Sequence, residues 1–218
     1  MNRELVHRIL TSLVLLPVLM FSLFHSGFYL LILLFFILII CFYEILKNTK
    51  NIIFNFVANI LIVFALFSFY HLRGDTNQSL IIIYWILSST FLSDIGGYFV
   101  GKIFKGKKLT KISPNKTYSG SIGSVIFSLA AIPSISYIQQ VFFEKDLINF
   151  YQLKYFTLTI LISIVCQLGD ICVSYYKRKI GIKNISNILP GHGGVLDRID
   201  GLVFVLIFSY ILKIIGLI

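Results

Sequence analysis

Charged side chains are scarce in this sequence: they make up 13% of its 218 residues, whereas hydrophobic residues make up 57%. With a mean hydropathy of +0.90, the chain has too little polar surface to cover a water-soluble globule, which excludes that class of protein. Among the charged residues, Asp and Glu are the minority: there are 9 of them against 19 Lys and Arg, and the net charge is +10. That excess of positive charge suits anionic lipid headgroups and anionic ligands.

Cysteine is also rare, and the spacings of Cys41, Cys166 and Cys172 match neither a zinc site nor a redox pair. We interpret all three as small buried apolar residues. No soluble module is available to read nucleic acid, so no nucleic-acid partner is expected. Internal repeats and low-complexity linkers are lacking as well. We expect no cleavable signal, since the first apolar run contains Pro17 and leads straight into a second run.

Long apolar runs are what the chain has in abundance. Several exceed the roughly 18–20 residues that a helix needs to cross a bilayer, whereas a β-barrel would show short alternating segments. We therefore predict an all-α, polytopic integral membrane helical bundle with about seven transmembrane helices, of which the first two could form one long hairpin. We expect a single domain, 1–218, with N-terminal spans in 1–78 and a catalytic part in 79–218. The runs lie at 9–25, from there to about Leu46, and at 52–71, 79–101, 119–140, 155–176 and 200–217.

Basic residues gather on alternate connections between these runs, which hold 15 of the 19 Lys and Arg residues. Because Lys and Arg beside short loops remain on the cytoplasmic side, we expect the N-terminus inside and the C-terminus outside. The two long polar loops, 102–118 and 177–199, then face the cytoplasm. Functional residues should lie in these loops and at the adjoining helix ends.

The sixth run ends in a polar stripe. In QLGDICVSYYKRK, the residues Asp170, Ser174, Lys177 and Arg178 share one face of a helix. The carboxylate must face protein or water, because an unpaired charge in lipid is expensive. An ion pair that serves only packing is the alternative interpretation.

The segment ILPGHGGVLDRIDG, residues 188–201, precedes the last apolar run. Asp197 and Asp200 lie three residues apart at the start of that run, where one of them could simply cap the helix. The glycines around His192 would let backbone N–H groups approach a phosphate or a metal-bound ligand, although the segment could equally be a plain turn. His192 is either a ligand contact or a solvated loop residue, and Arg198 could be a simple positive-inside anchor.

The other long loop repeats this combination of charges and hydroxyl groups. Asp94, in FLSDIGGYFVGK, is a lone intramembrane carboxylate, and KISPNKTYSG adds Ser113, Lys116 and Thr117. Carboxylates beside cations and hydroxyl groups indicate a site for phosphate and a hard divalent cation. Oxygen ligands without clustered Cys or His favour Mg²⁺ over zinc or copper.

These segments resemble the signature of the phosphatidate cytidylyltransferase (CDP-diacylglycerol synthase) family. An upstream block with SDIGGYFVGK and SPNKT also matches, so the resemblance runs from Ser93 onward. Asn184 stands where the family usually has Asp, and Ser186 where Gly is common. Asn115 replaces a usual Lys, and Ser119 a typical Glu. The matching C-terminal positions are Gly169, Asp170, Ser174, Lys177, Arg178, Lys183, Pro190, Gly191, His192, Gly193, Gly194, Asp197, Arg198 and Asp200.

The resemblance implies an enzyme in which the phosphate of phosphatidic acid attacks the α-phosphorus of CTP, giving CDP-diacylglycerol and pyrophosphate. It implies Mg²⁺ as cofactor, with a second, monovalent cation as an option, and leaves a homodimer open. The site would face the cytoplasm from a bacterial inner membrane. Asp170 and Asp197 are assigned to the metal, and Asp200 and Asp94 to the metal or its support. The phosphates and substrates are assigned to Lys177, Arg178, His192, Arg198, Ser174, Lys183, Gly193, Gly194, Ser113, Lys116 and Thr117.

Three other interpretations remain at this point. A transporter or channel would distribute polar residues through the mid-depth of several helices, whereas here they gather at the cytoplasmic ends. Another CTP-dependent membrane lipid phosphotransferase would need the same kinds of residue. A non-catalytic member of the same fold would be consistent with the departures at Asn184 and Ser119.

Overall fold

The computed structural model describes residues 3–49, 51–110, 113, 116–182, 184–191 and 193–218. Within this part of the chain, all of the extended regular elements are helices. They are α1 (Arg3–His25), α2 (Gly27–Asn48), α3 (Ile52–Arg73), α4 (Asn77–Phe104), α5 (Tyr118–Ser128), α6 (Ala131–Phe143), α7 (Leu153–Lys179) and α8 (Leu196–Ile214).

Six helical segments of the described chain are long and apolar enough to cross a membrane, and they coincide with the first six expected runs. The seventh run forms α8, whose first turns carry Asp197, Arg198 and Asp200. The predicted all-α membrane bundle is therefore confirmed, and the chain is an integral membrane protein. Which side of the membrane holds each terminus remains a prediction.

The fifth span is broken into α5 and α6 at Leu129 and Ala130. Pro133 lies in the first turn of α6, where its missing N–H group costs nothing. Its ring would clash with the carbonyl group of Leu129 if the helix continued regularly through this point. The N–H group of Ile132 instead bonds to that carbonyl at 3.1 Å, in a tighter turn.

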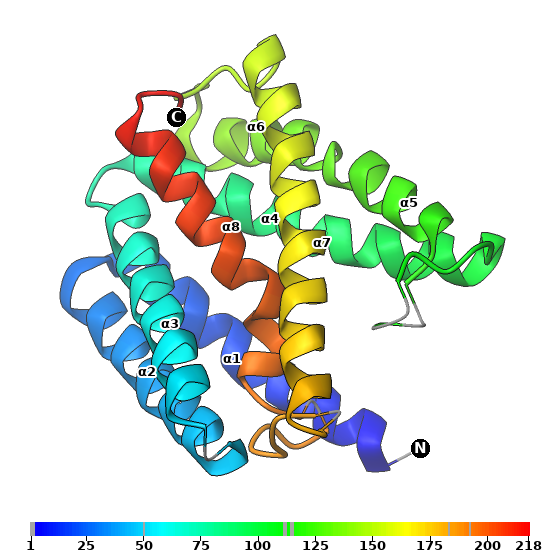
Figure 1. Cartoon of the computed structure of the whole chain (residues 1–218). Helices are drawn as coiled ribbons and strands as arrows, with labels where there is room; N and C mark the ends of the chain where they lie inside the picture. Colours follow the sequence, from blue (N-terminus) through cyan, green and yellow to red (C-terminus); the bar gives the residue numbers. More distant parts are fainter. Residues whose placement is uncertain (1–2, 50, 111–112, 114–115, 183, 192) are drawn as a thin grey trace.

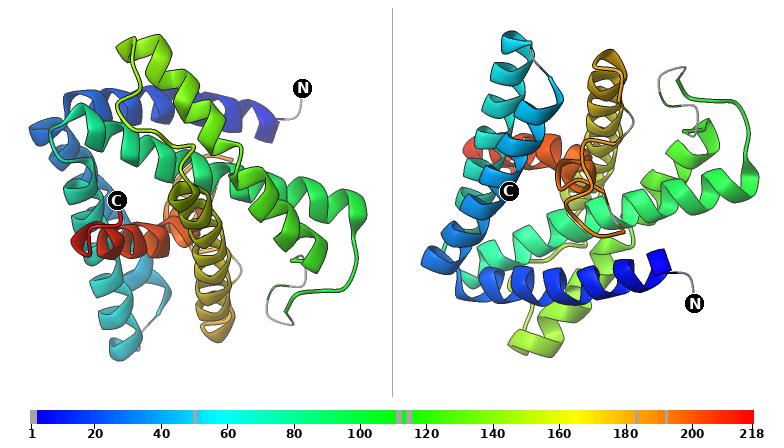
Figure 2. Two further views of the ribbon diagram at one scale, coloured as in Figure 1. Left: turned by 90° about the horizontal axis from the view of Figure 1, so that it is seen from above. Right: turned by 90° about the horizontal axis from the view of Figure 1, so that it is seen from below.

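The helices contact one another in an order that brings the end of α7 and the start of α8 together (Figure 1). α7 packs along α8, α3 covers α8, and α2 covers α3. α4 crosses the bundle and contacts α5, α6 and α7. The loop that joins α7 to α8 lies beside the N-terminal part of α1, whereas the C-terminus lies at the other end of the molecule (Figures 1 and 2).

The interior combines aromatic packing with a few paired polar groups. Trp85 is fully buried and its indole nitrogen donates to the hydroxyl of Thr159 at 3.0 Å. The hydroxyl groups of Ser93 and Ser163 pair at 2.8 Å between α4 and α7. Many large apolar side chains remain exposed on the outer faces of the helices, as lipid contact requires.

Glycines allow α4 and α5 to touch through their backbones. A Cβ atom on Gly96 would lie 2.5 Å from the carbonyl oxygen of Gly123, and one on Gly123 would lie 2.8 Å from the carbonyl oxygen of Gly96. Small residues permit this kind of close helix contact in membranes. The contact fixes the position of α5, and therefore of Lys116 just before it.

The cysteines are free in the structure. Cys41 and Cys166 are buried, as predicted, but Cys172 is exposed, so the expectation of burial was wrong there. Cys172 follows Asp170 by two residues, which turns it about 200° around the helix axis. Because Asp170 faces the protein interior, Cys172 faces outward.

Labelling of single cysteines should reveal the orientation. Lys107 precedes α5 and Lys145 follows α6, and both are exposed. We expect a membrane-impermeant thiol reagent, added to intact cells, to label Lys145→Cys and to spare Lys107→Cys, because basic loops stay cytoplasmic. The parent chain, with its exposed Cys172, gives the background. The reverse pattern would contradict the expected orientation.

Candidate functional site

Lys177 of α7 joins two carboxylates at the start of α8. Its Nζ lies 2.9 Å from Oδ1 of Asp197 and 3.6 Å from Oδ2 of Asp200. The side chains of Lys177 and Asp197 are only 12% and 9% exposed. Lys177 of the predicted polar stripe therefore does point into the protein, where it neutralises the carboxylates of α8.

A second lysine neutralises the carboxylate of α7. Nζ of Lys116 lies 2.9 Å from Oδ2 of Asp170 and also donates to the carbonyl group of Gln167 at 3.4 Å. Asp200, in the first turns of α8, lies near enough to Asp170 for the two carboxyl groups to interact electrostatically. Lys116, Asp170, Asp200, Lys177 and Asp197 thus form one connected set of charges, which we call the charge network. It links the start of α5 to α7 and α8.

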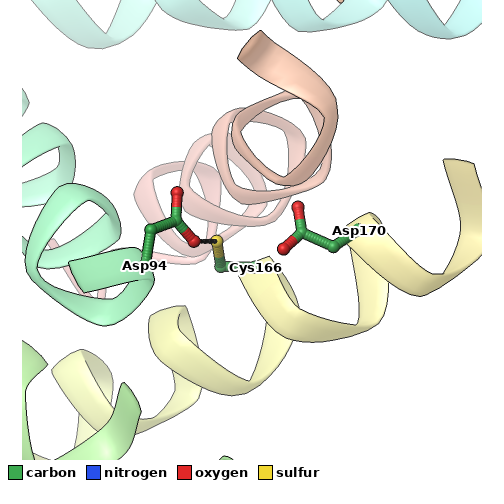
Figure 3. A group of neighbouring side chains, drawn as sticks. All are labelled: Asp94, Cys166 and Asp170. Carbon is green, nitrogen blue, oxygen red and sulfur yellow. Dashed lines mark hydrogen bonds between the residues drawn. The ribbon is translucent and has the colours of Figure 1, made fainter. Parts of the chain in front are cut away.

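Asp94 adds another carboxylate to one end of the charge network. Ligand atoms of Asp94, Cys166 and Asp170 all lie within 4.8 Å of one another. Sγ of Cys166 donates to Oδ1 of Asp94 at 3.6 Å, and the two carboxylates flank the thiol from α4 and α7 (Figure 3). Asp94 is exposed and Asp170 half-buried, so the protein itself does not cover the two carboxylates. Carboxylate oxygens are the ligands that Mg²⁺ prefers, whereas the thiol is a softer donor.

The close approach of α8 to this group depends on Gly201. A Cβ atom there would lie 2.6 Å from Oδ1 of Asp170 and 2.7 Å from Sγ of Cys166. Any larger residue would push α8 away from α7 at this level. Glycine at this position therefore lets the start of α8, which carries Asp200, lie directly against Asp170.

The glycine segment before α8 forms a tight hairpin. The backbone groups of Leu189 and Gly193 exchange two hydrogen bonds, at 2.9 and 3.1 Å. Gly191 and Gly193 have φ angles of 75° and 90°, which side chains disfavour. Leu189 and Gly193 are therefore paired across a turn, and Gly193 lies on the wall of a neighbouring cavity.

The N–H groups that follow the hairpin point at carboxylates of the protein itself. The N–H group of Gly194 donates to Oδ2 of Asp197 at 3.2 Å. Those of Val195 and Leu196 donate to Oε1 and Oε2 of Glu44, each at 2.9 Å. The donors of Val195 and Leu196 thus hold α2 and α8 together, whereas the sequence pattern led us to assign the glycine segment to phosphate.

A cavity of about 670 Å³ opens beside the hairpin. Three basic side chains, from α1, α7 and α8, line it together with backbone and amide groups. Nε of Arg8 also donates to the carbonyl oxygen of Gly191 at 2.8 Å, which ties α1 to the hairpin. The lining suits an anionic ligand. Its members are Arg8, Lys177, Asn184, Asn187, Leu189, Pro190, Gly191, Gly193, Asp197 and Arg198.

Other predicted site residues have local roles in the structure. Arg178 is exposed, and its Nη1 donates to the carbonyl group of Ile182 at 3.2 Å. Thr117 caps α5, since its hydroxyl accepts from the N–H group of Gly120 at 3.1 Å. The N–H group of Ser113 donates to the hydroxyl of Thr110 at 3.1 Å. Ser174 lies half-buried on α7.

The substrate roles of these four residues remain predictions. Lys183 and His192 lie outside the described residues, so their assignments also remain predictions.

Two charged residues of the site, Glu44 and Arg8, were not assigned from the sequence. Glu44 is the only carboxylate in the second apolar run, and the cost of a charge in a membrane was a usable signal for it. Arg8 carried no such signal, because a basic residue before the first span is what the positive-inside rule predicts of any membrane protein.

Comparison with known proteins shows which family the sequence matches. Residues 47–215 match the model of the cytidylyltransferase family. The chain is 35% identical to the phosphatidate cytidylyltransferase of Bacillus subtilis, over 82% of this chain and 66% of that protein. It is 35% identical to that of Rickettsia conorii, over 64% of this chain and 60% of that protein. The phosphatidate cytidylyltransferase of Helicobacter pylori is 37% identical, over 65% of this chain and 48% of that protein.

The chain spans between about half and two-thirds of the length of these curated relatives. The matched region begins at residue 47, just before α3, and includes α3 to α8, so it contains the whole charge network and the hairpin. Since this match covers most of the sequence, the chain belongs to the cytidylyltransferase family.

Proposed function

We propose that this chain is a phosphatidate cytidylyltransferase, which makes CDP-diacylglycerol and pyrophosphate from CTP and phosphatidic acid. One observation carries the proposal: the charge network meets the basic cavity at Lys177 and Asp197, which belong to both. A nucleotide bound in the cavity would therefore contact the ion pair of Lys177 and Asp197 directly. The names of the bacterial relatives support the choice of substrates.

The reaction brings two anions together. An oxygen of the phosphatidic acid phosphate forms a bond to the α-phosphorus of CTP while the bond to the β-phosphate breaks and pyrophosphate leaves. The attacking oxygen is already ionised, so no general base is required. Arg8, Lys177 and Arg198 would lower the repulsion between the reactants and stabilise the charge that develops on pyrophosphate.

The carboxylates fit a hard divalent cation. Asp94 and Asp170 bring their oxygens together, and Asp200 lies near Asp170 on α8. The lysines occupy only some of these oxygens, since Lys116 contacts Oδ2 of Asp170. We therefore propose Mg²⁺ as the cofactor, held by Asp170 with Asp94 and Asp200, with Asp197 as a further ligand and a second, monovalent cation as an option. When bound, Mg²⁺ would neutralise phosphate charge and help to align the reacting groups.

The proposed site faces the cytoplasm of a bacterial cell from the inner membrane. CTP would enter the cavity from water, and phosphatidic acid would approach laterally from the lipid. The placement of basic residues on alternate loops supports this orientation, and the bacterial origin of the relatives supports the membrane.

A labelling assay tests the proposed function. Purified protein in detergent is incubated with Mg²⁺ and either phosphatidic acid or diacylglycerol, using CTP labelled at the α- or the γ-phosphate. We expect α-label to enter lipid only with phosphatidic acid. Transfer of γ-label to diacylglycerol would instead identify a lipid kinase. Absence of lipid product across a Mg²⁺ titration would contradict the proposal.

Neutralising the carboxylates should abolish most of this activity. We expect Asp170→Asn and Asp197→Asn each to lower kcat at least about 100-fold, roughly 2.7 kcal/mol in the barrier. The double variant should be little worse than either single variant, because the charges act as one unit. Steady-state rates across a Mg²⁺ titration provide the measurement, with the exposed Asp146→Asn as the matched control. Losses that simply multiply in the double variant would argue against a shared site.

Arg8 should contribute to nucleotide binding although it lies outside the family match. Its guanidinium lines the cavity, so Arg8→Ala should raise the KM for CTP by about tenfold, and Arg8→Lys should raise it less. The KM for each substrate is measured separately, with exposed Lys145→Ala as the control for loss of a positive charge. An unchanged KM for CTP in Arg8→Ala would remove Arg8 from the binding site.

A further inference from the structure

Helix α8 carries the site residues Asp197 and Asp200, yet it begins without a side-chain cap at its N-cap position. Val195 occupies that position and offers no hydrogen-bond acceptor. The first N–H groups of a helix have no partners within the helix, and leaving them unpaired in a buried place is costly. Leu196 is buried, so its N–H group needs an acceptor from elsewhere in the protein.

Glu44, near the end of α2, supplies that acceptor. Its side chain is fully buried, and its two oxygens accept from the N–H groups of Val195 and Leu196, each at 2.9 Å. The hydroxyl of Ser186 donates to Oε1 at 2.5 Å. These three donors are neutral, and the start of a helix stabilises a negative charge through its dipole. A residue more than 150 positions away in sequence thus caps α8.

We propose that Glu44 is a positioning residue for nucleotide binding: by capping α8 from α2, it fixes the loop that carries the cavity wall and Asp197. The inference rests on the proposed function only for its kinetic consequence. Glu44 lies before residue 47, where the family match begins, and nothing in that match assigns it a role.

The close approach of Gly194 to Glu44 is an independent sign that Glu44 holds this loop in place. A Cβ atom on Gly194 would lie 2.9 Å from Oε1 of Glu44 and 3.1 Å from Oδ2 of Asp197. The loop therefore passes between two carboxylates at a distance that only glycine permits. Glycine is common at the position of Ser186 in the phosphatidate cytidylyltransferase family. Here the serine adds a hydroxyl donor that glycine lacks.

The geometry predicts why glutamine cannot replace Glu44. Its amide oxygen could take the place of Oε1, but its NH₂ group would then face the N–H group of Leu196, a donor against a donor. The start of α8 would lose one bond and gain a repulsive contact. Asp197, one residue beyond Leu196, would move with it.

Hydrogen–deuterium exchange on the full-length protein in detergent provides a readout that needs no activity. In Glu44→Gln, we expect amide exchange of Val195 and Leu196 to rise at least about tenfold, with α4 and α5 unchanged. Glu144→Gln, at an exposed glutamate after α6, is the matched control and should resemble the parent. Unchanged exchange in 186–196 of a folded Glu44→Gln variant would overturn the proposal.

Kinetics then separate positioning from a loss of folded protein. A smaller folded fraction lowers the apparent kcat and leaves KM alone, whereas a displaced cavity wall should raise the KM for CTP at least about fivefold and leave that for phosphatidic acid unchanged. An unchanged KM for CTP would contradict the role in nucleotide binding. If the parent has no CTP-dependent activity, the proposed function fails, and the exchange experiment still decides whether Glu44 holds the loop.

Ser186→Ala provides a second, milder variant. It removes one donor to Glu44 without creating a repulsive contact, so exchange in 186–196 should rise about two- to threefold. Should Glu44→Gln fail to fold, this variant decides, and exchange equal to that of the parent would overturn the proposal.

Discussion

A carboxylate inside an apolar bundle is tolerated only where a cation or a hydrogen-bond donor meets it, and this constraint organises the whole structure. Lys116 meets Asp170, Lys177 meets Asp197, and the first N–H groups of α8 meet Glu44. Each partner comes from a different element than the carboxylate that it neutralises. The contacts that hold the helices together are therefore the same contacts that build the site.

Such contacts require helices that approach more closely than ordinary side chains allow. Gly201 brings α8 against Asp170 and Cys166, and the pair Gly96 and Gly123 brings α5 against α4. Lipid offers little hydrophobic drive for helix association, so close packing and polar pairing must supply it. The glycines are thus as necessary to the charge network as the charged residues themselves.

The sequence predicted what depends on local pattern. Hydropathy placed the spans, and helical spacing put Asp170 and Lys177 on one inward face, as the ion pairs of both residues confirm. The break between α5 and α6 was missed, because Pro133 lies in an otherwise apolar run. Glu44 and Arg8 were missed for a different reason: their partners, Leu196 and Gly191, are more than 150 positions away, and no local pattern encodes such pairs.

The position of the hairpin donors also determines how an anion can be bound. A phosphate at the N–H groups of Gly194, Val195 and Leu196 would have to displace Asp197 or Glu44, against the repulsion of both carboxylates. Recognition of an anion in the cavity would therefore rely on side-chain cations, among them Lys177, which two carboxylates already share. An anion that drew on Lys177 would weaken its hold on Asp197 and Asp200 and so leave these carboxylates freer to hold a cation. Under the proposed function, binding of the nucleotide and binding of the cation would in this way be coupled through a single ammonium group.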